Sequence, residues 1–174
     1  MDCIAYYESP LGRMTMAGSG DTLTGLWFDG QKHFGSTLTV KHTEGETAVF
    51  QQTREWLELY FSGREPGFTP PIMLQGTPFQ REVWAMLRAV PYGRTVTYGE
   101  LAKELAGQRN IVRMSAQAVG AAVGRNPVSI IIPCHRVIGA DGSLTGYAGG
   151  IDRKNALLLL ESDAPGYTGY RRHE

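Results

Sequence analysis

Cysteine is scarce in this 174-residue sequence, and the two that occur, Cys3 and Cys134, are too few for a disulfide-stapled secreted domain. The four histidines are scattered, and no two Cys or His residues have zinc-site spacing, so we expect no metal. No apolar run approaches the roughly 18 residues of a membrane span, and MDCIAYYESP lacks the basic region of a secretory signal. Neither a phosphate-binding loop nor a dinucleotide-binding glycine motif occurs, so we expect no cofactor. These absences predict a cytoplasmic protein that does not associate with membranes.

The chain also lacks a net charge, but basic and acidic residues are unevenly distributed between its two halves. The chain has 17 basic and 17 acidic residues. Residues 1–75 hold five basic and nine acidic residues, whereas residues 76–174 hold twelve basic and eight acidic ones. The basic second half is a modest indication of a polyanionic partner, and a randomly uneven surface explains it about equally well.

The first 75 residues have the pattern of a small sheet domain. Strand-like runs occur at Cys3–Glu8, Arg13–Ala17 and Thr22–Phe28, and the turn signal SPLG joins the first two. Apolar residues at helical spacing predict a helix from Thr47 to Phe61. Three prolines between residues 66 and 71 are typical of a linker, so we place a domain boundary near residue 75.

The second half is mainly helical in pattern. Thr77-Pro78 is typical of a helix start. Two short helices are predicted at 97–105 and 113–123, with a turn at 107–110 between them. Two short helices around a tight turn predict a helix-turn-helix.

The pattern changes again towards the C-terminus. Ser129–Ile132 has the apolar character of a buried strand, and a glycine-rich loop spans 139–150. A last amphipathic helix is predicted from Asp152 to Glu161, and the polar tail 162–174 is expected to be loosely ordered. We therefore predict an α/β fold, in which a small N-terminal antiparallel sheet with a helix precedes a mainly helical C-terminal domain with the helix-turn-helix and an active-site loop.

Cys134 lies at the end of the predicted strand and directly before His135, a position at which catalytic groups often lie. A nearby imidazole favours the thiolate, which is the nucleophilic form of cysteine. A buried, inert thiol is nevertheless the commoner fate of a single cysteine. The adjacency of the two residues alone leaves both interpretations open.

The second helix of the predicted helix-turn-helix is composed largely of small residues and keeps Gly120 in its interior. A glycine inside a helix costs roughly 0.5–1 kcal/mol. Such a helix suits close packing within the protein or close approach to a shallow nucleic-acid groove.

Three motifs in the second half are distinctive. They are GTPFQREVWAMLRAVPYGRTVTYGELA at 76–102, NPVSIIIPCHRV at 126–137 and LTGYAGGIDRKNALLLLE at 144–161. Together they resemble the O6-alkylguanine-DNA alkyltransferase family, strongly over 76–161 and more weakly over the N-terminal strands. The resemblance implies a ribonuclease-H-like N-terminal domain (1–75) and a DNA-binding and methyltransferase domain (76–174). It also implies direct-reversal DNA repair, in which the alkyl group of O6-methylguanine moves irreversibly and once per molecule to Cys134.

The resemblance further implies catalytic roles. Cys134 would be the nucleophile, and His135 would help to deprotonate it through a water molecule. Glu161 would orient His135, as in a catalytic triad, and Asn126 would brace the turn before the active site. From the residues alone, Glu161 would be the solvated end of a helix and Asn126 an ordinary turn residue.

Substrate-binding roles follow in the same way. Tyr98 would donate to the guanine ring, and the backbone near Val137 would hold the guanine amino group. Tyr147 and the amide of Ala148 would lie over the pocket; some family members have a serine in place of this alanine. Lys154 would lie near the active-site loop, but it is equally compatible with a surface base.

The partner implied by the resemblance is double-stranded DNA carrying an alkylated guanine, which a monomer binds in the minor groove and whose damaged base it extrudes. The second helix would contribute Gln117 and Ala118, and Arg113 and Arg125 would contact phosphates. Gln117 replaces an arginine that often fills the space left by the extruded base. This difference should affect base flipping rather than the chemistry.

Three alternatives remain. A lesion-binding protein without transfer is disfavoured because such relatives replace the cysteine. A Cys-His hydrolase would use Cys134 and His135 on an ester or amide, but it gives the helix-turn-helix no role. A transcription regulator would use the helix-turn-helix alone. The range of alkyl groups and activity on O4-methylthymine stay open.

Overall fold

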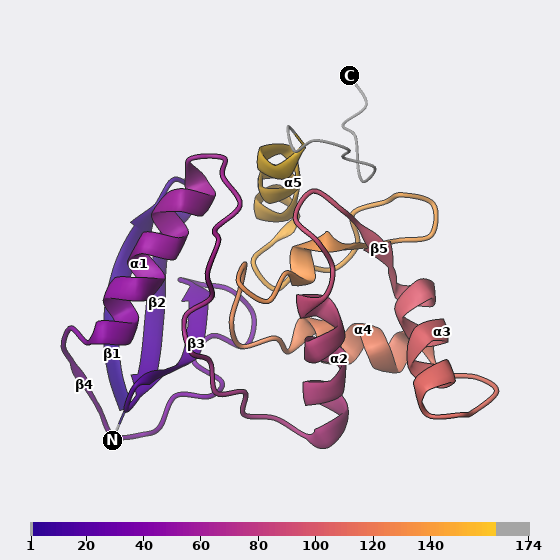
Figure 1. Cartoon of the computed structure of the whole chain (residues 1–174), viewed down its shortest axis with the longest axis horizontal. Helices are drawn as coiled ribbons and strands as arrows, with labels where there is room; N and C mark the ends of the chain where they lie inside the picture. Colours follow the sequence, from indigo (N-terminus) through magenta and orange to yellow (C-terminus); the bar gives the residue numbers. More distant parts are fainter. Residues whose placement is uncertain (1, 163–174) are drawn as a thin grey trace. The chain divides into compact units, whose positions relative to one another are not determined.

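The computed structural model describes residues 2–162, which form two compact units (Figure 1). The N-terminal unit runs to Gln75 and includes Pro127–Ile131, and the C-terminal unit comprises Gly76–Asn126 and the chain from Ile132 onwards. The loose tail predicted from the sequence lies, from residue 163, outside the described residues. Among residues 2–162, no helix combines the length and the apolar character that crossing a membrane requires.

The N-terminal unit contains a four-stranded sheet in the order β3-β2-β1-β4. The predicted antiparallel strands are present as β1 (Asp2–Ser9), β2 (Gly12–Ser19) and β3 (Thr22–Phe28). An additional edge strand, β4 (His42–Glu44), pairs in parallel with β1, so the sheet is mixed. The residues of β4 are exposed and polar, and the sequence therefore showed no strand pattern there.

One helix, α1 (Ala48–Phe61), packs on this sheet. The Thr47 hydroxyl accepts a hydrogen bond from the Phe50 amide and caps the first turn, close to the predicted start. Side chains at helical spacing form its buried face: Val49, Phe50, Thr53, Trp56, Leu57 and Tyr60. The helix thus buries part of the sheet, and an apolar cluster of Ile4, Ala17 and Trp27, with Tyr6 and Leu38 packed against it, adds to the core.

The strand predicted at Ser129–Ile132 is wrong. Within the N-terminal unit, Val128 forms an isolated bridge with Leu26, and the Leu26 amide donates to the Pro127 carbonyl. Ile130 then has a φ of 69°, a left-handed conformation that interrupts an extended strand. The apolar run is buried as expected, but it forms a turn.

The C-terminal unit begins with α2 (Pro78–Arg88). Thr77 and Gln80 form a reciprocal capping box at its start. Its buried face carries Trp84, whose indole Nε1 donates to the carbonyl of Ala122 at 2.8 Å. This hydrogen bond fixes α2 against the second helix of the helix-turn-helix.

The predicted helix-turn-helix consists of α3 (Tyr98–Gln108) and α4 (Ala116–Gly124). The predicted boundaries were wrong by about three residues. α3 continues into the predicted turn, and α4 begins later than Arg113 because the Ser115 hydroxyl accepts from the Ala118 amide and caps the helix there.

Three short elements complete the C-terminal unit before its last helix. β5 (Val96–Thr97) pairs in parallel with β6 (Val137–Ile138), and a single 3-10 turn, η1 (Cys134–Arg136), precedes β6. The last helix is α5 (Ile151–Glu161), one residue longer than predicted. The pairing of β5 with β6 brings the start of α3 next to the segment that carries Cys134.

Candidate active site and nucleic-acid interface

Cys134 is the first residue of η1 and follows Pro133 directly. Its amide donates to the Ile132 carbonyl at 2.8 Å, and its carbonyl accepts from the Val137 amide. The backbone on both sides of the cysteine is therefore fixed. Both cysteines of the chain are free thiols, and within residues 2–162 no three His, Cys, Asp or Glu side chains form a group that could hold a metal ion.

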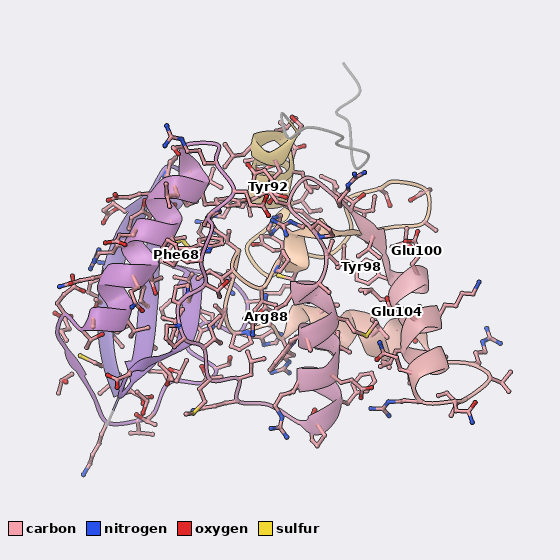
Figure 2. The ribbon with its side chains drawn as sticks, in the orientation of Figure 1. Phe68, Arg88, Tyr92, Tyr98, Glu100 and Glu104 are labelled. Atoms are coloured by element: carbon pink, nitrogen blue, oxygen red, sulfur yellow. The ribbon has the colours of Figure 1, made fainter. Side chains whose placement is uncertain are left out.

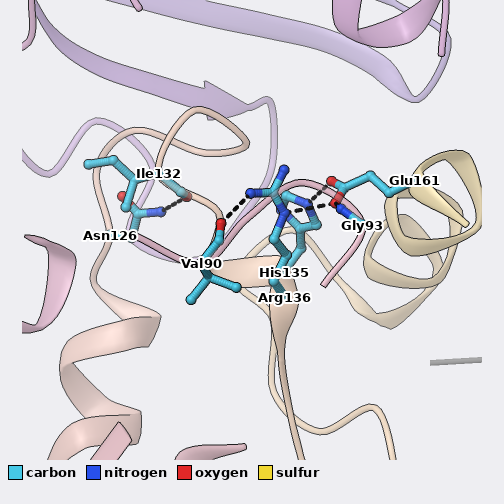
Figure 3. Close-up of polar contacts among 7 residues, drawn as sticks. All are labelled: Val90, Gly93, Asn126, Ile132, His135, Arg136 and Glu161. Carbon is cyan, nitrogen blue, oxygen red and sulfur yellow. Dashed lines mark hydrogen bonds and ion pairs between the residues drawn. The ribbon is translucent and has the colours of Figure 1, made fainter. Parts of the chain in front are cut away.

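Asn126 supports the cysteine through its side chain. Its amide Nδ2 donates to the Ile132 carbonyl at 2.7 Å (Figure 3). This bond joins two residues of the C-terminal unit that flank the segment 127–131 in the sequence. Burial raises the pKa of the Cys134 thiol. A hydrogen bond from Asn126 and the charge of Lys154 oppose this shift without cancelling it. The resting thiol is therefore protonated near neutral pH and needs a base.

Glu161, the last residue of α5, is fully buried and receives three donors (Figure 3). Its Oε2 lies 2.5 Å from Nε2 of His135. Its Oε1 accepts from Nε of Arg136 at 2.7 Å and from the Gly93 amide at 3.1 Å. The interpretation of Glu161 as the solvated end of a helix, which the residues alone favoured, is therefore wrong.

The charges in this network determine the form of His135. Burial alone would raise the pKa of Glu161, but the adjacent His135 and Arg136 hold that pKa far below its usual range. Burial lowers the pKa of His135, and the charges of Arg136 and Lys154 lower it further, against the opposing effect of Glu161. A neutral imidazole beside an ionised carboxylate must donate through Nε2. This assigns the lone pair, and thus the basic site, to Nδ1.

The sequence did not single out Arg136, which is part of this buried network. Besides its contact with Glu161, its guanidinium donates to the Val90 carbonyl at 2.8 Å and lies 5.6 Å from the ring centroid of Tyr92. It keeps the Glu161 carboxylate ionised in the interior. The available signal was a charged residue directly after the Cys-His pair, since a buried arginine requires a counterion.

Lys154 of α5 is fully buried, so the surface-base interpretation is wrong. Its Nζ donates to the carbonyls of Val137, at 2.5 Å, and Thr145, at 3.0 Å. Burial lowers the pKa of Lys154 to about 8, while the nearby Cys134 thiol acts in the opposite direction. One side chain thus links β6 to the glycine-rich loop.

Tyr98, the first residue of α3, lies against the same loop. Its hydroxyl donates to the carbonyl of Thr145 at 3.0 Å, and its ring centroid is 5.9 Å from Nζ of Lys154. Burial raises the pKa of Tyr98, which keeps the phenol a donor at neutral pH. The predicted substrate-binding residues Tyr98, Val137 and Lys154 are therefore close together. Tyr147 is buried and Ala148 half-buried, two and three residues beyond Thr145.

The predicted DNA-binding residues lie elsewhere in the unit. Gln117 and Ala118 are exposed on α4, and the exposed Arg113 and Arg125 lie just before and just after that helix. A Cβ added to Gly120 would meet only the Tyr98 ring, at 3.6 Å, which is ordinary contact. Internal packing therefore does not require this glycine.

A buried cysteine supported by a His-Glu pair, in a unit with a helix-turn-helix, defines a protein that couples a nucleophile to a nucleic-acid-binding motif. Residues 78–163 match the family model described as the DNA binding domain of 6-O-methylguanine DNA methyltransferase. Residues 3–74 match the ribonuclease-like domain of the same family. The chain therefore belongs to the 6-O-methylguanine DNA methyltransferase family.

Individual relatives agree over nearly the whole chain. The methylated-DNA–protein-cysteine methyltransferase of Mycobacterium bovis is 45% identical over 159 residues, which are 91% of this chain and 92% of the relative. That of Haemophilus influenzae is 41% identical over 157 residues, 90% of this chain and 84% of the relative. The crystal structure of Mycobacterium tuberculosis OGT in complex with DNA is 42% identical, with a TM-score of 0.82 over 92% of each chain.

Proposed function

We propose that the protein repairs duplex DNA by moving the alkyl group of O6-methylguanine onto Sγ of Cys134, once per molecule. Direct reversal of alkylation damage by a methylated-DNA–protein-cysteine methyltransferase is the activity of the family to which the chain belongs. The observation that carries the assignment of Cys134 is its buried position beside Asn126 and next to the His135–Glu161 pair.

The protonation states support a specific sequence of steps. Nδ1 of His135 takes the thiol proton, directly or through a water molecule, and Glu161 stabilises the resulting imidazolium. The Cys134 thiolate then attacks the methyl carbon in line; the S–C bond forms as the C–O6 bond breaks. The electron pair of the C–O6 bond stays on guanine, which takes up a proton in place of the one lost by the thiol. Ordinary thiol chemistry does not break the S–C bond of the thioether, so Cys134 stays alkylated and each protein molecule reacts only once.

The residues beside the cysteine would bind the extruded base. The Tyr98 hydroxyl, which now donates to the loop carbonyl of Thr145, would donate to the guanine ring instead. The backbone at Val137 would hold the guanine amino group, while Tyr147 and the Ala148 amide would cover the base. Lys154 would hold the glycine-rich loop in place through its hydrogen bonds to the Val137 and Thr145 carbonyls.

Duplex DNA is the proposed partner, bound through α4. Gln117 and Ala118 would enter the minor groove, where small side chains permit close approach. Arg113 and Arg125 would contact phosphates and set the register. The monomeric state and the cytoplasmic location stay predictions of the sequence.

Intact-protein mass spectrometry tests the proposal. The wild-type chain is mixed with excess duplex DNA carrying one O6-methylguanine, and Cys3→Ala serves as the control that retains Cys134. We expect the mass of one methylene to be added, mapped to Cys134 and limited to one per molecule. Tight lesion binding without added mass would identify a lesion-binding protein. No binding, with Cys134-dependent turnover of a chromogenic ester, would identify a hydrolase.

A further inference from the structure

The connection between α3 and α4 is longer than a helix-turn-helix usually has. It comprises Arg109–Ser115, seven residues by sequence number, where three or four are typical. The extra length forms an open loop beyond the end of α3 (Figure 1).

The beginning of the connection is fixed by backbone and side-chain contacts. Asn110 has a left-handed φ of 54°, its amide donates to Gly107, and the Ile111 amide donates to Ala106. These two bonds form a Schellman motif. The Arg109 guanidinium contacts the Glu82 carboxylate at 2.5 Å. The connection therefore leaves α3 in a defined direction rather than as a frayed end.

Its centre presents apolar side chains to solvent. Val112 is fully exposed and Ile111 is 45% exposed. Single exposed apolar residues are common, but these two are consecutive and, together with Met114, line one hollow. The hollow has a volume of about 860 Å³ and lies between α3 and the connection. Exposed apolar residues gathered in one place are typical of a contact surface.

The positive charge of the hollow favours an anionic partner. Its lining includes Lys103 and Arg113 and no acidic residue. The acidic residues Glu100 and Glu104 lie on α3 (Figure 2) but outside the lining. The hollow ends at Ser115 and Ala116, where α4 begins, so it is continuous with the helix proposed to enter the DNA groove. Cations beside aliphatic side chains fit a sugar-phosphate backbone, which alternates anionic phosphates with apolar deoxyribose faces.

We propose that the connection 109–115 is a second DNA contact that extends the footprint of α4 along the duplex. Lys103 and Arg113 pair with phosphates, and Val112 packs against deoxyribose. This proposal rests on the proposed function insofar as DNA is the substrate, but it concerns binding and not transfer.

The electrostatic part is tested by the salt dependence of binding to unmodified duplex DNA, measured with the full chain by fluorescence anisotropy. The double variant Lys103→Gln/Arg113→Gln should weaken binding roughly tenfold at physiological salt and reduce the slope of log K against log salt by about 2. Lys32→Gln/Lys41→Gln removes the same charge from exposed positions of the N-terminal unit and should leave the slope unchanged. An unchanged slope in the first variant, or an equal loss in both, overturns the phosphate contacts.

The apolar part is tested by Val112→Thr, which keeps the shape of the side chain and makes one branch polar. Binding should weaken about threefold with no change in the salt slope. Val40→Thr is the matched control, because Val40 is equally exposed but lies in the N-terminal unit, and it should bind as the wild type does. Wild-type affinity in Val112→Thr overturns the contact, and thermal unfolding verifies that both variants are folded.

Methyl transfer from free O6-methylguanine base separates this proposal from the proposed function. Val112→Thr and the two control variants should react with the free base at the wild-type rate, because none of them alters the Cys134 site or a residue already assigned to DNA binding. If the wild type transfers neither from the free base nor from duplex DNA carrying O6-methylguanine, the proposed function fails, and the anisotropy results still decide whether the connection contacts DNA.

Discussion

Two regions of the C-terminal unit are constructed in opposite ways. Next to Cys134, the ionisable side chains of His135, Arg136 and Glu161 lie in the interior, where His135 and Arg136 each contact Glu161. On α4, Gln117 and the small residues around it lie in solvent. Electrostatic interactions in the first region act in a low dielectric, and salt screens them little. Those in the second region are weakened by water and salt.

The difference separates how the protein sets its chemistry from how it sets its binding. A buried network fixes protonation states, and removing one member leaves another charge without a counterion. An exposed face tolerates substitution and changes affinity by modest steps. Mutations in the two regions should therefore differ in size and in which measurement they alter.

The largest effect is expected at the centre of the buried region. Cys134→Ala should abolish methyl transfer, because no other group would accept the alkyl carbon, and it should leave DNA binding by α4 intact. Transfer is measured by protein mass and binding by anisotropy with O6-methylguanine duplex. Cys3→Ala, in the N-terminal unit, should retain both activities. Residual methylation of Cys134→Ala would transfer the acceptor role to another residue.

Next in size is Glu161→Gln. It removes the carboxylate that orients His135 and leaves Arg136 as a buried charge without a counterion, which costs about 3–5 kcal/mol of unfolding free energy. Iodoacetamide labelling of Cys134 at neutral pH should slow about a hundredfold, since the neutral amide makes His135 a weaker base. Urea unfolding and labelling rates provide the measurements.

Glu82→Gln is the matched control, because it removes a carboxylate from an exposed ion pair on α2. The Glu82–Arg109 pair is about one-third exposed, so its loss should cost less than about 1 kcal/mol and leave labelling unchanged. Equal costs for the two substitutions would remove the distinction between the regions. An unchanged labelling rate in Glu161→Gln would remove Glu161 from the active site.

The same contrast explains what the sequence could predict. Local signals placed the helices: Thr47, Thr77 and Thr97 each accept a hydrogen bond from an amide of the first turn of the helix that follows. The motifs around Cys134 predicted the family of the chain, and the match to the family model confirms it. These signals depend on few neighbouring residues, and tertiary packing does not override them.

What the sequence could not predict depends on contacts between distant residues. The burial of Glu161 and Lys154 follows from how α5 packs on η1 and β6, which no local pattern encodes. The role of Arg136 appears only when Glu161 and Val90 are brought next to it. The branched residues of 129–132 favour a strand by propensity, but hydrogen bonds with Leu26 and a left-handed Ile130 form a turn.

The pH dependence of stability tests the burial of Lys154. Its pKa in the folded protein is lowered to about 8, so between pH 8 and the usual lysine range the unfolded chain binds more protons than the folded one. The contribution of Lys154 to the free energy of unfolding should therefore rise with pH over this window, by roughly 3 kcal/mol in total. Cys134, whose pKa is raised by burial, contributes in the opposite direction. Lys154→Met should lack this rise. Urea unfolding at a series of pH values provides the comparison.

An exposed lysine provides the control for this profile. Lys103→Met should retain the rise of the wild type, because Lys154 is unchanged in it. Parallel profiles for Lys154→Met and the wild type would mean that Lys154 titrates alike in the folded and unfolded chains. Its link between Val137 and Thr145 would then be a contact of a solvated side chain rather than part of the buried region.

The smallest effect is expected on α4, where Gln117→Arg adds a cation at the position proposed to fill the space left by the extruded base. Repair of O6-methylguanine should accelerate roughly fivefold in duplex DNA, the equivalent of one partly screened charge contact. Single-stranded DNA has no space to fill, so its rate should change much less. Gln52→Arg adds the same charge to an exposed position of α1 and separates general attraction to DNA from a local contact. Equal acceleration on both substrates, or by both variants, would mean that Gln117 affects only binding and has no part in base flipping.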